Sequence, residues 1–169
     1  MVKRRSFTIK ASGILRQLVT PCFVSVATKL SGAADRPAQC QYSSIWDTGA
    51  TFSMVSKRVV AELGLQEEGY ANIHHAGGEA QHVPIYHVDL LLFNNVQVAN
   101  ARVGLVLAKN VEVIIGMDII NRGDFAISNR NGATIFSFRI PSVESFDFAA
   151  EDNLQGSGVR SGNGGHETR

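Results

Sequence analysis

The chain has 169 residues, 44% of them hydrophobic, and a formal net charge of +1, a size that suits one domain with a tail. Acidic and basic residues are interspersed, which excludes the basic stripe of a nucleic-acid-binding protein. No apolar run approaches the roughly 20 residues needed to span a bilayer, and Lys10 and Arg16 interrupt the first apolar stretch, so we expect a soluble, cytoplasmic protein with no membrane partner.

The first part of the chain is predicted to form short strands and one helix. Alternating apolar and polar residues, bounded by turn residues, predict strands over 7–9, 14–26 and 42–46. The segment 29–39 is rich in small residues and is predicted to be a loop. A helix should follow the third strand, because Ser56 can cap its first turn and Gly64 can end it.

The rest of the chain continues with strands and tight turns. Strands are predicted as a hairpin over 70–88 with its tip at 76–79, and then over 88–92, 96–98, 102–107, 111–117, 125–128 and 133–138. Asn131-Gly132 is the commonest short hairpin signal, and a short helix over 118–122 should end at Gly123. Many short strands with one or two short helices predict an all-β, barrel-like domain.

The sequence divides into three segments. Residues 1–5 are a basic N-terminal segment that contains Lys3-Arg4-Arg5. Residues 6–140 form the predicted domain. From 141 to 169, Gly, Ser, Asn and charged residues dominate and hydrophobic periodicity stops, so this segment is predicted to be a disordered tail.

One turn carries the strongest chemical signal. In Ile45-Trp46-Asp47-Thr48-Gly49-Ala50, a carboxylate lies on a Gly turn between an apolar strand and a helix. An Asp-Thr-Gly triplet alone is weak, because chance produces one in roughly a few per cent of chains this long. A second segment, Val111 to Met117, also runs from an apolar strand into a Gly before a helix. The two segments therefore look like half-copies of one unit.

With these segments the chain resembles the retropepsin-like aspartic proteases, a retroviral type that also occurs as single-domain bacterial proteins. That family combines Asp-Thr/Ser-Gly-Ala, a Gly-rich flap hairpin, and two apolar residues followed by Gly before a helix. The matching residues are Asp47-Thr48-Gly49-Ala50, Ala76-Gly77-Gly78 and Ile114-Ile115-Gly116. The resemblance covers about residues 12–140 and implies a closed β-barrel that functions as a homodimer.

The resemblance also implies the catalytic chemistry. Peptide hydrolysis of this type needs two close carboxyls that share one proton, because two like charges about 3 Å apart cannot both ionise. The chain has one Asp-Thr-Gly, and Asp118 is expected to cap the short helix that follows Gly116. The dyad is therefore expected from Asp47 of two subunits. The interface should combine the Asp47 turns with terminal strands, where Ile135, Phe136 and Phe138 offer apolar area.

Further residues take roles that the resemblance implies. The Thr48 hydroxyl would reach the partner backbone at the dimer axis; a turn residue that bonds its own backbone is the alternative. Gly49 would donate its amide to the carboxylates, and Ala50 would line the floor of the cleft. Thr51 is expected among the substrate-binding residues, at a position where many retroviral members have Asp. Trp46 replaces the usual Leu and is expected in the core.

The flap is expected at Ala76, Gly77 and Gly78, where Gly permits the dihedrals of a mobile hairpin tip that folds over a substrate. A plain surface turn is the alternative, because the repeated Ile-Gly-Gly of retroviral flaps is absent. The histidines nearby do not predict a metal site, because their spacings match no zinc motif; they are His74, His75, His82 and His87. Cys22 and Cys40 are expected to be free thiols.

The sequence therefore predicts an aspartic endopeptidase, active as a homodimer on an extended peptide, that needs no metal or other cofactor. Two alternatives remain open at this point. A non-catalytic dimeric module of the same fold could bind or scaffold peptides without turnover. An unrelated β-barrel could carry the triplet by chance, and a structure with the two Gly turns side by side would exclude it.

Overall fold

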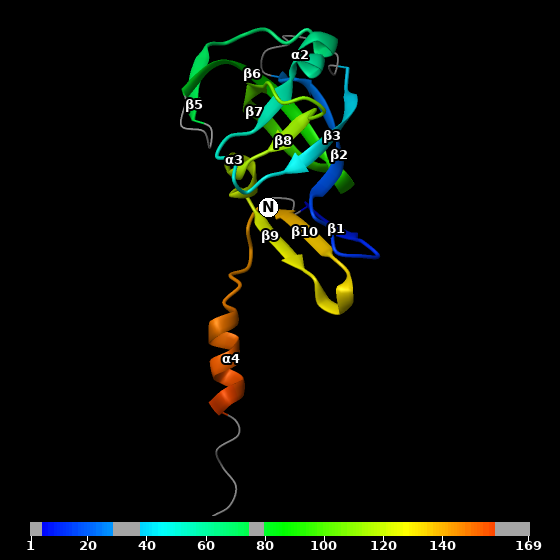
Figure 1. Ribbon diagram of the computed structural model, residues 1–169, viewed down its shortest axis with the longest axis vertical. Helices are drawn as coiled ribbons and strands as arrows, with labels where there is room; N and C mark the ends of the chain where they lie inside the picture. Colours follow the sequence, from blue (N-terminus) through cyan, green and yellow to red (C-terminus); the bar gives the residue numbers. More distant parts are fainter. Residues whose placement is uncertain (1–4, 29–37, 75–79, 158–169) are drawn as a thin grey trace, which may run out of the picture.

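The computed structural model describes residues 5–28, 38–74 and 80–157 (Figure 1). Its strands are β1 (Arg5–Lys10), β2 (Leu18–Val26), β3 (Cys40–Trp46), β4 (Met54–Ser56), β5 (Tyr70–His74), β6 (Ala80–Leu92), β7 (Val96–Val106), β8 (Val113–Ile115), β9 (Asp124–Ser128) and β10 (Ile135–Ile140). Its helices are α2 (Lys57–Leu63), α3 (Met117–Ile120) and α4 (Phe148–Ser157), with single 3-10 turns η1 (Phe93–Asn95) and η2 (Arg130–Gly132). No helix in these ranges is long and apolar enough to cross a membrane.

The strands form a closed barrel and a small separate sheet. The larger sheet has the order β2-β3-β8-β4-β7-β6-β5, and pairing between β2 and β6 closes the first six of these strands into a barrel. The smaller sheet has the order β1-β10-β9 and lies at one end of the barrel (Figure 1). The predicted mostly-β, barrel-like fold with few short helices is confirmed.

Aromatic side chains join the small sheet to the barrel. Trp46, at the end of β3, packs against Phe138 with ring centroids 4.7 Å apart and against Phe136 at 5.1 Å. The Trp46 indole N–H donates to the Thr20 hydroxyl at 2.9 Å, so the polar part of this buried ring is satisfied. The prediction that Trp46 lies in the core is confirmed.

The expected interface role of two of these residues is wrong. Phe136 and Phe138 are each 1% exposed, because they face Trp46 and Phe7 inside the chain. Ile135 lies on the opposite face of β10 and is 38% exposed, as expected for successive residues of a strand. Of the three apolar residues named from the sequence, Ile135 alone offers surface to a partner.

Several local predictions are confirmed. The Ser56 hydroxyl accepts a hydrogen bond from the Val59 amide at the start of α2, and Gly64 ends the helix with φ of 59°. Asn131 and Gly132, between β9 and β10, have φ of 58° and 74°, the pair of positive values that a tight hairpin turn needs. Cys22 and Cys40 are free, and burial raises the pKa of the Cys22 thiol to about 12.

The segment expected to be a disordered tail contains helix α4, which projects from the body of the protein (Figure 1). Asp147 explains where this helix begins, because its carboxylate accepts a hydrogen bond from the Ala150 amide at 3.0 Å. A carboxylate at this position satisfies a free amide of the first turn. Residues 158–169 of the expected tail lie outside the described residues.

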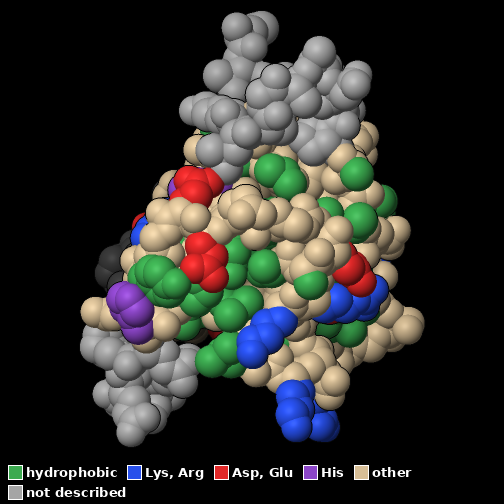
Figure 2. Space-filling view, turned by 90° about the horizontal axis from the view of Figure 1, so that it is seen from above, with side chains coloured by type: hydrophobic (Ala, Val, Ile, Leu, Met, Phe, Trp, Pro, Cys, Tyr) green, Lys and Arg blue, Asp and Glu red, His purple; other side chains and the backbone are tan. Residues whose placement is uncertain are grey.

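Figure 2 shows the end of the molecule that carries α2, where acidic and basic side chains lie scattered among apolar ones. Over the described part of that face, neither sign of charge gathers into a large patch. This distribution matches the interspersed charges of the sequence.

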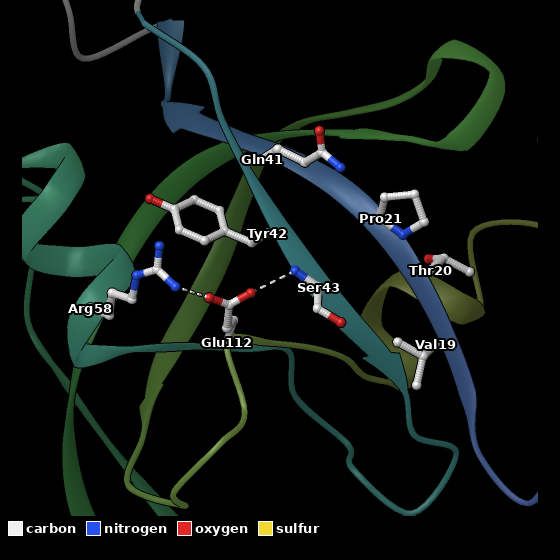
Figure 3. A pocket seen from close by; sticks show the side chains of 8 residues that line it. All are labelled: Val19, Thr20, Pro21, Gln41, Tyr42, Ser43, Arg58 and Glu112. Carbon is white, nitrogen blue, oxygen red and sulfur yellow. Dashed lines mark hydrogen bonds and ion pairs between the residues drawn. The ribbon is translucent and has the colours of Figure 1, made fainter.

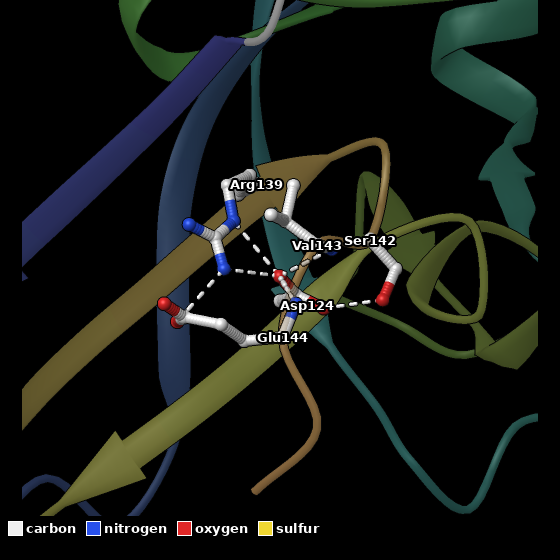
Figure 4. A network of polar contacts seen from close by, with 5 residues as sticks. All are labelled: Asp124, Arg139, Ser142, Val143 and Glu144. Carbon is white, nitrogen blue, oxygen red and sulfur yellow. Dashed lines mark hydrogen bonds and ion pairs between the residues drawn. The ribbon is translucent and has the colours of Figure 1, made fainter.

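A polar network fixes the chain after β10 to the small sheet (Figure 4). The Asp124 carboxylate accepts hydrogen bonds from the Ser142 hydroxyl, from the Val143 amide at 2.9 Å and from the Arg139 Nε at 2.8 Å. The Ser142 hydroxyl, followed by the Val143 amide and Arg139, holds the pKa of Asp124 well below its usual range. These donors favour the ionised form, although the carboxylate is nearly buried.

We expect the network to stabilise the fold in a pH-dependent way. Because the pKa of Asp124 is depressed in the folded state, its contribution is full above the unfolded pKa of about 4 and declines as pH falls below it. Asp124→Asn should therefore lower the melting temperature at pH 7, and the difference from wild type should shrink below about pH 4. Thermal unfolding at pH 7 and at a pH below about 4 measures this effect, with the exposed Asp152→Asn as control. A pH-independent difference would contradict it.

Candidate active site

The two Gly-containing segments lie side by side in the barrel. Strand β3 pairs in parallel with β8, with Ile45 opposite Ile114 and Trp46 opposite Ile115. Beyond the paired residues, the Asp47 amide donates to the Ile115 carbonyl at 3.0 Å. This arrangement excludes an unrelated barrel that carries the triplet by chance, which was one of the alternatives left open by the sequence.

The Asp47 turn holds its own carboxylate. The Gly49 amide donates to Asp47 Oδ1 at 2.8 Å, and the Ala50 amide donates to the Asp47 carbonyl at 3.2 Å. A Cβ at position 49 would lie 3.2 Å from Asp47 Oδ1, closer than most real Cβ contacts. The carboxylate is half-buried, and Thr48, Gly49 and Thr51 beside it are exposed. One oriented carboxylate therefore faces an open surface.

Gly116 lets the second turn approach the first. A Cβ at this position would lie 2.8 Å from the Ala50 carbonyl oxygen and 2.8 Å from the Phe52 carbonyl carbon. Both contacts are with backbone, so a side chain would force the two turns apart. The Met117 amide uses the close approach to donate to the Ala50 carbonyl at 2.8 Å. The Gly of the apolar-apolar-Gly pattern is therefore required because the two turns pack too closely for a side chain at this position.

Ser53 ties the two turns together, and sequence reasoning missed it. Its buried hydroxyl accepts from the Gly116 amide at 2.9 Å and donates to Asp118 Oδ1 at 2.6 Å. Its carbonyl accepts from the Gly104 amide of β7 at 3.0 Å. In the sequence, Ser53 is only a small hydroxyl residue six positions after Asp47. Its role becomes visible in the structure, where the hydroxyl is buried between the Gly116 amide and the Asp118 carboxylate.

Asp118 does not cap α3, which corrects the sequence prediction. Gly116 is the N-cap residue, and Asp118 lies inside the first turn. Its carboxylate accepts the Ser53 hydroxyl instead, while an acidic residue in the first turn still favours the helix dipole. Asp118 is therefore a bonded neighbour of the second turn and no copy of Asp47.

A cavity of about 480 Å³ lies beside Asp47 and Thr48, toward the small sheet. The other residues that line it come from β2 and the segment before it, from the end of β3, from β9 and from the connection between β9 and β10. Its apolar members include Leu15, Leu18, Phe125 and Ile127. Leu15 is 40% exposed and Ile127 is 46% exposed. Apolar surface thus borders the candidate catalytic residue.

The base of the predicted flap hairpin is described, and its tip is not. Strands β5 and β6 pair antiparallel from Tyr70 opposite Pro84 to His74 opposite Ala80, which confirms the hairpin. The tip residues expected to contact substrate lie outside the described residues: Ala76, Gly77 and Gly78. In the described part of the hairpin, Tyr70 stacks on His82 with ring centroids 4.7 Å apart.

The described histidines take part in local contacts. His82 Nδ1 lies 3.0 Å from Asn72 Oδ1, and His87 Nδ1 lies 2.8 Å from Glu68 Oε2. Among the described side chains, no group of three or more His, Cys, Asp or Glu residues could hold a metal ion.

A second pocket, of about 450 Å³, lies away from Asp47 on the outside of β2 and β3 (Figure 3). Arg58 bonds to Glu112 at 2.6 Å and to Glu62 at 2.8 Å. The other oxygen of Glu112, the residue directly before β8, accepts a hydrogen bond from the Ser43 amide at 2.8 Å. The charged side chains of this pocket, Arg58 and Glu112, are bonded to other residues of the protein. The pocket beside Asp47 is therefore the better candidate for the active site.

Comparison with known proteins agrees with this geometry. Residues 39–122 match the family described as gag-polyprotein putative aspartyl protease. The fold is similar to the crystal structure of a retropepsin-like aspartic protease from Rickettsia conorii, with a TM-score of 0.52 and 14% identity over 82% of this chain and 96% of that chain. A retroviral protease-like domain of Ddi1 from Leishmania major has a TM-score of 0.44 and 15% identity over 79% of this chain and 99% of that chain. No curated protein matches the sequence.

The role of Ser53 gives a stability prediction. Ser53→Ala removes the hydroxyl and leaves the Gly116 amide and the Asp118 carboxylate without this partner. We expect a loss of about 1–3 kcal/mol in the free energy of unfolding, which is the usual cost of an unsatisfied buried group. Denaturant unfolding measures it, with Ser43→Ala, on the exposed face of β3, as the matched control. Equal stability of the two variants would contradict the assignment.

Proposed function

The chain belongs to the retropepsin-like aspartyl protease family, and from this premise we propose that it is an aspartic endopeptidase with a dyad made by Asp47 of two subunits. The carrying observation is the Asp47 carboxylate, oriented by the Gly49 amide and placed beside the Gly116 turn. Within the described residues, the second turn has Gly116 where the first has Asp47, and the nearby Asp118 lies inside α3 and is bonded to Ser53. One chain therefore offers half of a dyad.

The proposed chemistry follows from two close carboxyls that share one proton. The ionised carboxylate accepts a proton from water, and the resulting oxygen nucleophile adds to the scissile carbonyl carbon. The protonated partner donates a hydrogen bond to the carbonyl oxygen and supports the charge that develops there. Protonation of the amide nitrogen then lets the C–N bond break. No metal or other cofactor takes part in these steps.

We place the subunit interface at the free edge of β9. Within the described residues β9 pairs with β10 alone, so its other edge has unpaired backbone groups. Ile127 of β9 and Leu15 are exposed next to the cavity that contains Asp47 and Thr48. A strand that pairs antiparallel with its own copy obeys a two-fold axis, and such pairing would remove an exposed edge. This placement replaces the terminal aromatic surface expected from the sequence.

The proposed substrate is an extended peptide, bound between the floor of the dimer and two flaps. Ala50 and the exposed Thr51 follow Asp47 directly and would flank the peptide backbone. Thr48 would contact the partner at the axis, consistent with its exposure beside the cavity. Ala76, Gly77 and Gly78 would close over the substrate from the hairpin whose base is formed by β5 and β6. Pockets for alternate side chains would set sequence preference.

Asp47→Asn tests the catalytic assignment. Asn keeps the shape of the side chain but cannot accept a proton from water, so kcat/KM should fall by roughly 100-fold or more. The assay is cleavage of a peptide library, with light scattering to show that the variant still assembles like wild type. The exposed Asp152→Asn is the control and should cleave normally. Undiminished cleavage by purified Asp47→Asn would refute the role of Asp47, and a wild-type dimer without turnover would favour the non-catalytic binding module.

Ile127→Lys tests the interface. A charge on the proposed contact strand should weaken association, so activity per chain should fall and should depend more steeply on protein concentration than in wild type. Phe23→Lys, an exposed apolar residue on barrel strand β2, is the matched control. Dilution series of activity and of molecular mass measure both variants. An Ile127→Lys protein that associates as tightly as wild type would move the interface elsewhere.

A further inference from the structure

An arginine with unused hydrogen-bond donors lies beside the candidate active site. The Arg102 guanidinium carbon is 5.2 Å from the centroid of the Phe52 ring. Phe52 is half-buried and ends the turn that begins at Asp47, whereas Arg102 is exposed on β7. The pair therefore joins the site turn to a barrel strand far away in the sequence.

The backbone keeps these two side chains in register. Residue Gly104, two positions after Arg102, donates its amide to the carbonyl of Ser53, the residue that follows Phe52. Strand β4 continues this contact, with Met54 opposite Gly104 in a parallel pair. Because residues two apart on a strand lie on the same face, Arg102 has a fixed position relative to the end of the site turn.

The contact with the Phe52 ring leaves the guanidinium N–H donors available. A cation–π contact acts through the charge of the group, while the N–H donors of an arginine lie in the guanidinium plane and suit a carboxylate. Among the described residues, Arg102 donates no hydrogen bond and forms no ion pair. His87, which is opposite Arg102 in the strand pair, lies against Glu68.

Chain length limits how far this pair can lie from the catalytic carboxylate. Phe52 lies five positions after Asp47, which corresponds to at most about 18 Å of fully extended chain. A bound peptide in extended form advances about 3.3 Å per residue. A substrate side chain at Phe52 and Arg102 would therefore lie within roughly five residues of the scissile bond.

We propose that Arg102 and Phe52 form a specificity subsite for an acidic substrate side chain, Glu or Asp, away from the scissile bond. The Phe52 ring contacts the methylene groups of that side chain, and the in-plane N–H groups of Arg102 bind its carboxylate. This inference rests on the proposed protease function. Arg102 acts in substrate binding and takes no part in proton transfer.

The test compares matched peptides that carry Glu or Gln at each position on both sides of one cleavage site. Wild type should cleave the best Glu peptide with a kcat/KM roughly three- to tenfold above that of its Gln partner. The effect is modest because an ion pair at a partly exposed site is weak. It should appear mainly in KM, because Arg102 acts in binding. The preference should shrink in high salt and should grow as pH rises through the Glu pKa of about 4.3. Arg102→Met should abolish it, and Arg102→Glu should reverse it toward a Lys peptide.

Lys57→Met, which removes one positive charge from α2, is the matched control and should keep the preference. Failure of this inference differs from failure of the proposed function. A protein that cleaves Glu and Gln peptides equally, or an Arg102→Met variant that slows both to the same degree, overturns the subsite and leaves the protease assignment standing. A folded wild-type dimer that cleaves none of the peptides overturns the proposed protease function itself.

Discussion

Backbone contact between two Gly turns is the constraint on which the candidate site depends. The Asp47 amide bonds to the Ile115 carbonyl, and the Met117 amide bonds to the Ala50 carbonyl. These bonds join segments about 70 residues apart, and they are possible because Gly116 has no Cβ to meet the Ala50 and Phe52 backbone. The position of the carboxylate is therefore set by the barrel, because β3 and β8 are adjacent paired strands of it.

The small sheet makes the same site depend on both ends of the domain. Strands β1 and β10 pair along their whole length, and Phe7 and Phe138 bring them against Trp46. Trp46 directly precedes Asp47, so the residue before the carboxylate is held by packing and by a hydrogen bond to Thr20. Loosening the small sheet would thus disturb the site without touching it, since close-packed interiors transmit strain.

Local sequence signals predicted the elements well because their causes are local. Ser56 and Gly64 bound α2 through contacts within a few residues, and the Asn131-Gly132 turn needs only its own dihedrals. The Asp47-Thr48-Gly49 turn was found for the same reason. Ser53 and the Asp124 network were missed, because their partners are distant in sequence and a single chain gives no sign of them. The alternation of side chains along β10 gives the strand two faces, but it could not show which face the rest of the protein covers. For this reason Phe136 and Phe138 were wrongly expected at the subunit interface.

Two-fold symmetry links the proposed dyad to the proposed acidic subsite. If Asp47 of each subunit contributes one carboxyl, the axis passes between them, and every other subsite occurs twice at equal distance from the scissile bond. Arg102 and Phe52 would then offer a place for an acidic side chain on both sides of the cleavage point. A peptide with acidic residues on both flanks would satisfy two subsites in one binding event. The gain over a singly acidic peptide would exceed that of one contact, because the second contact forms with the peptide already bound.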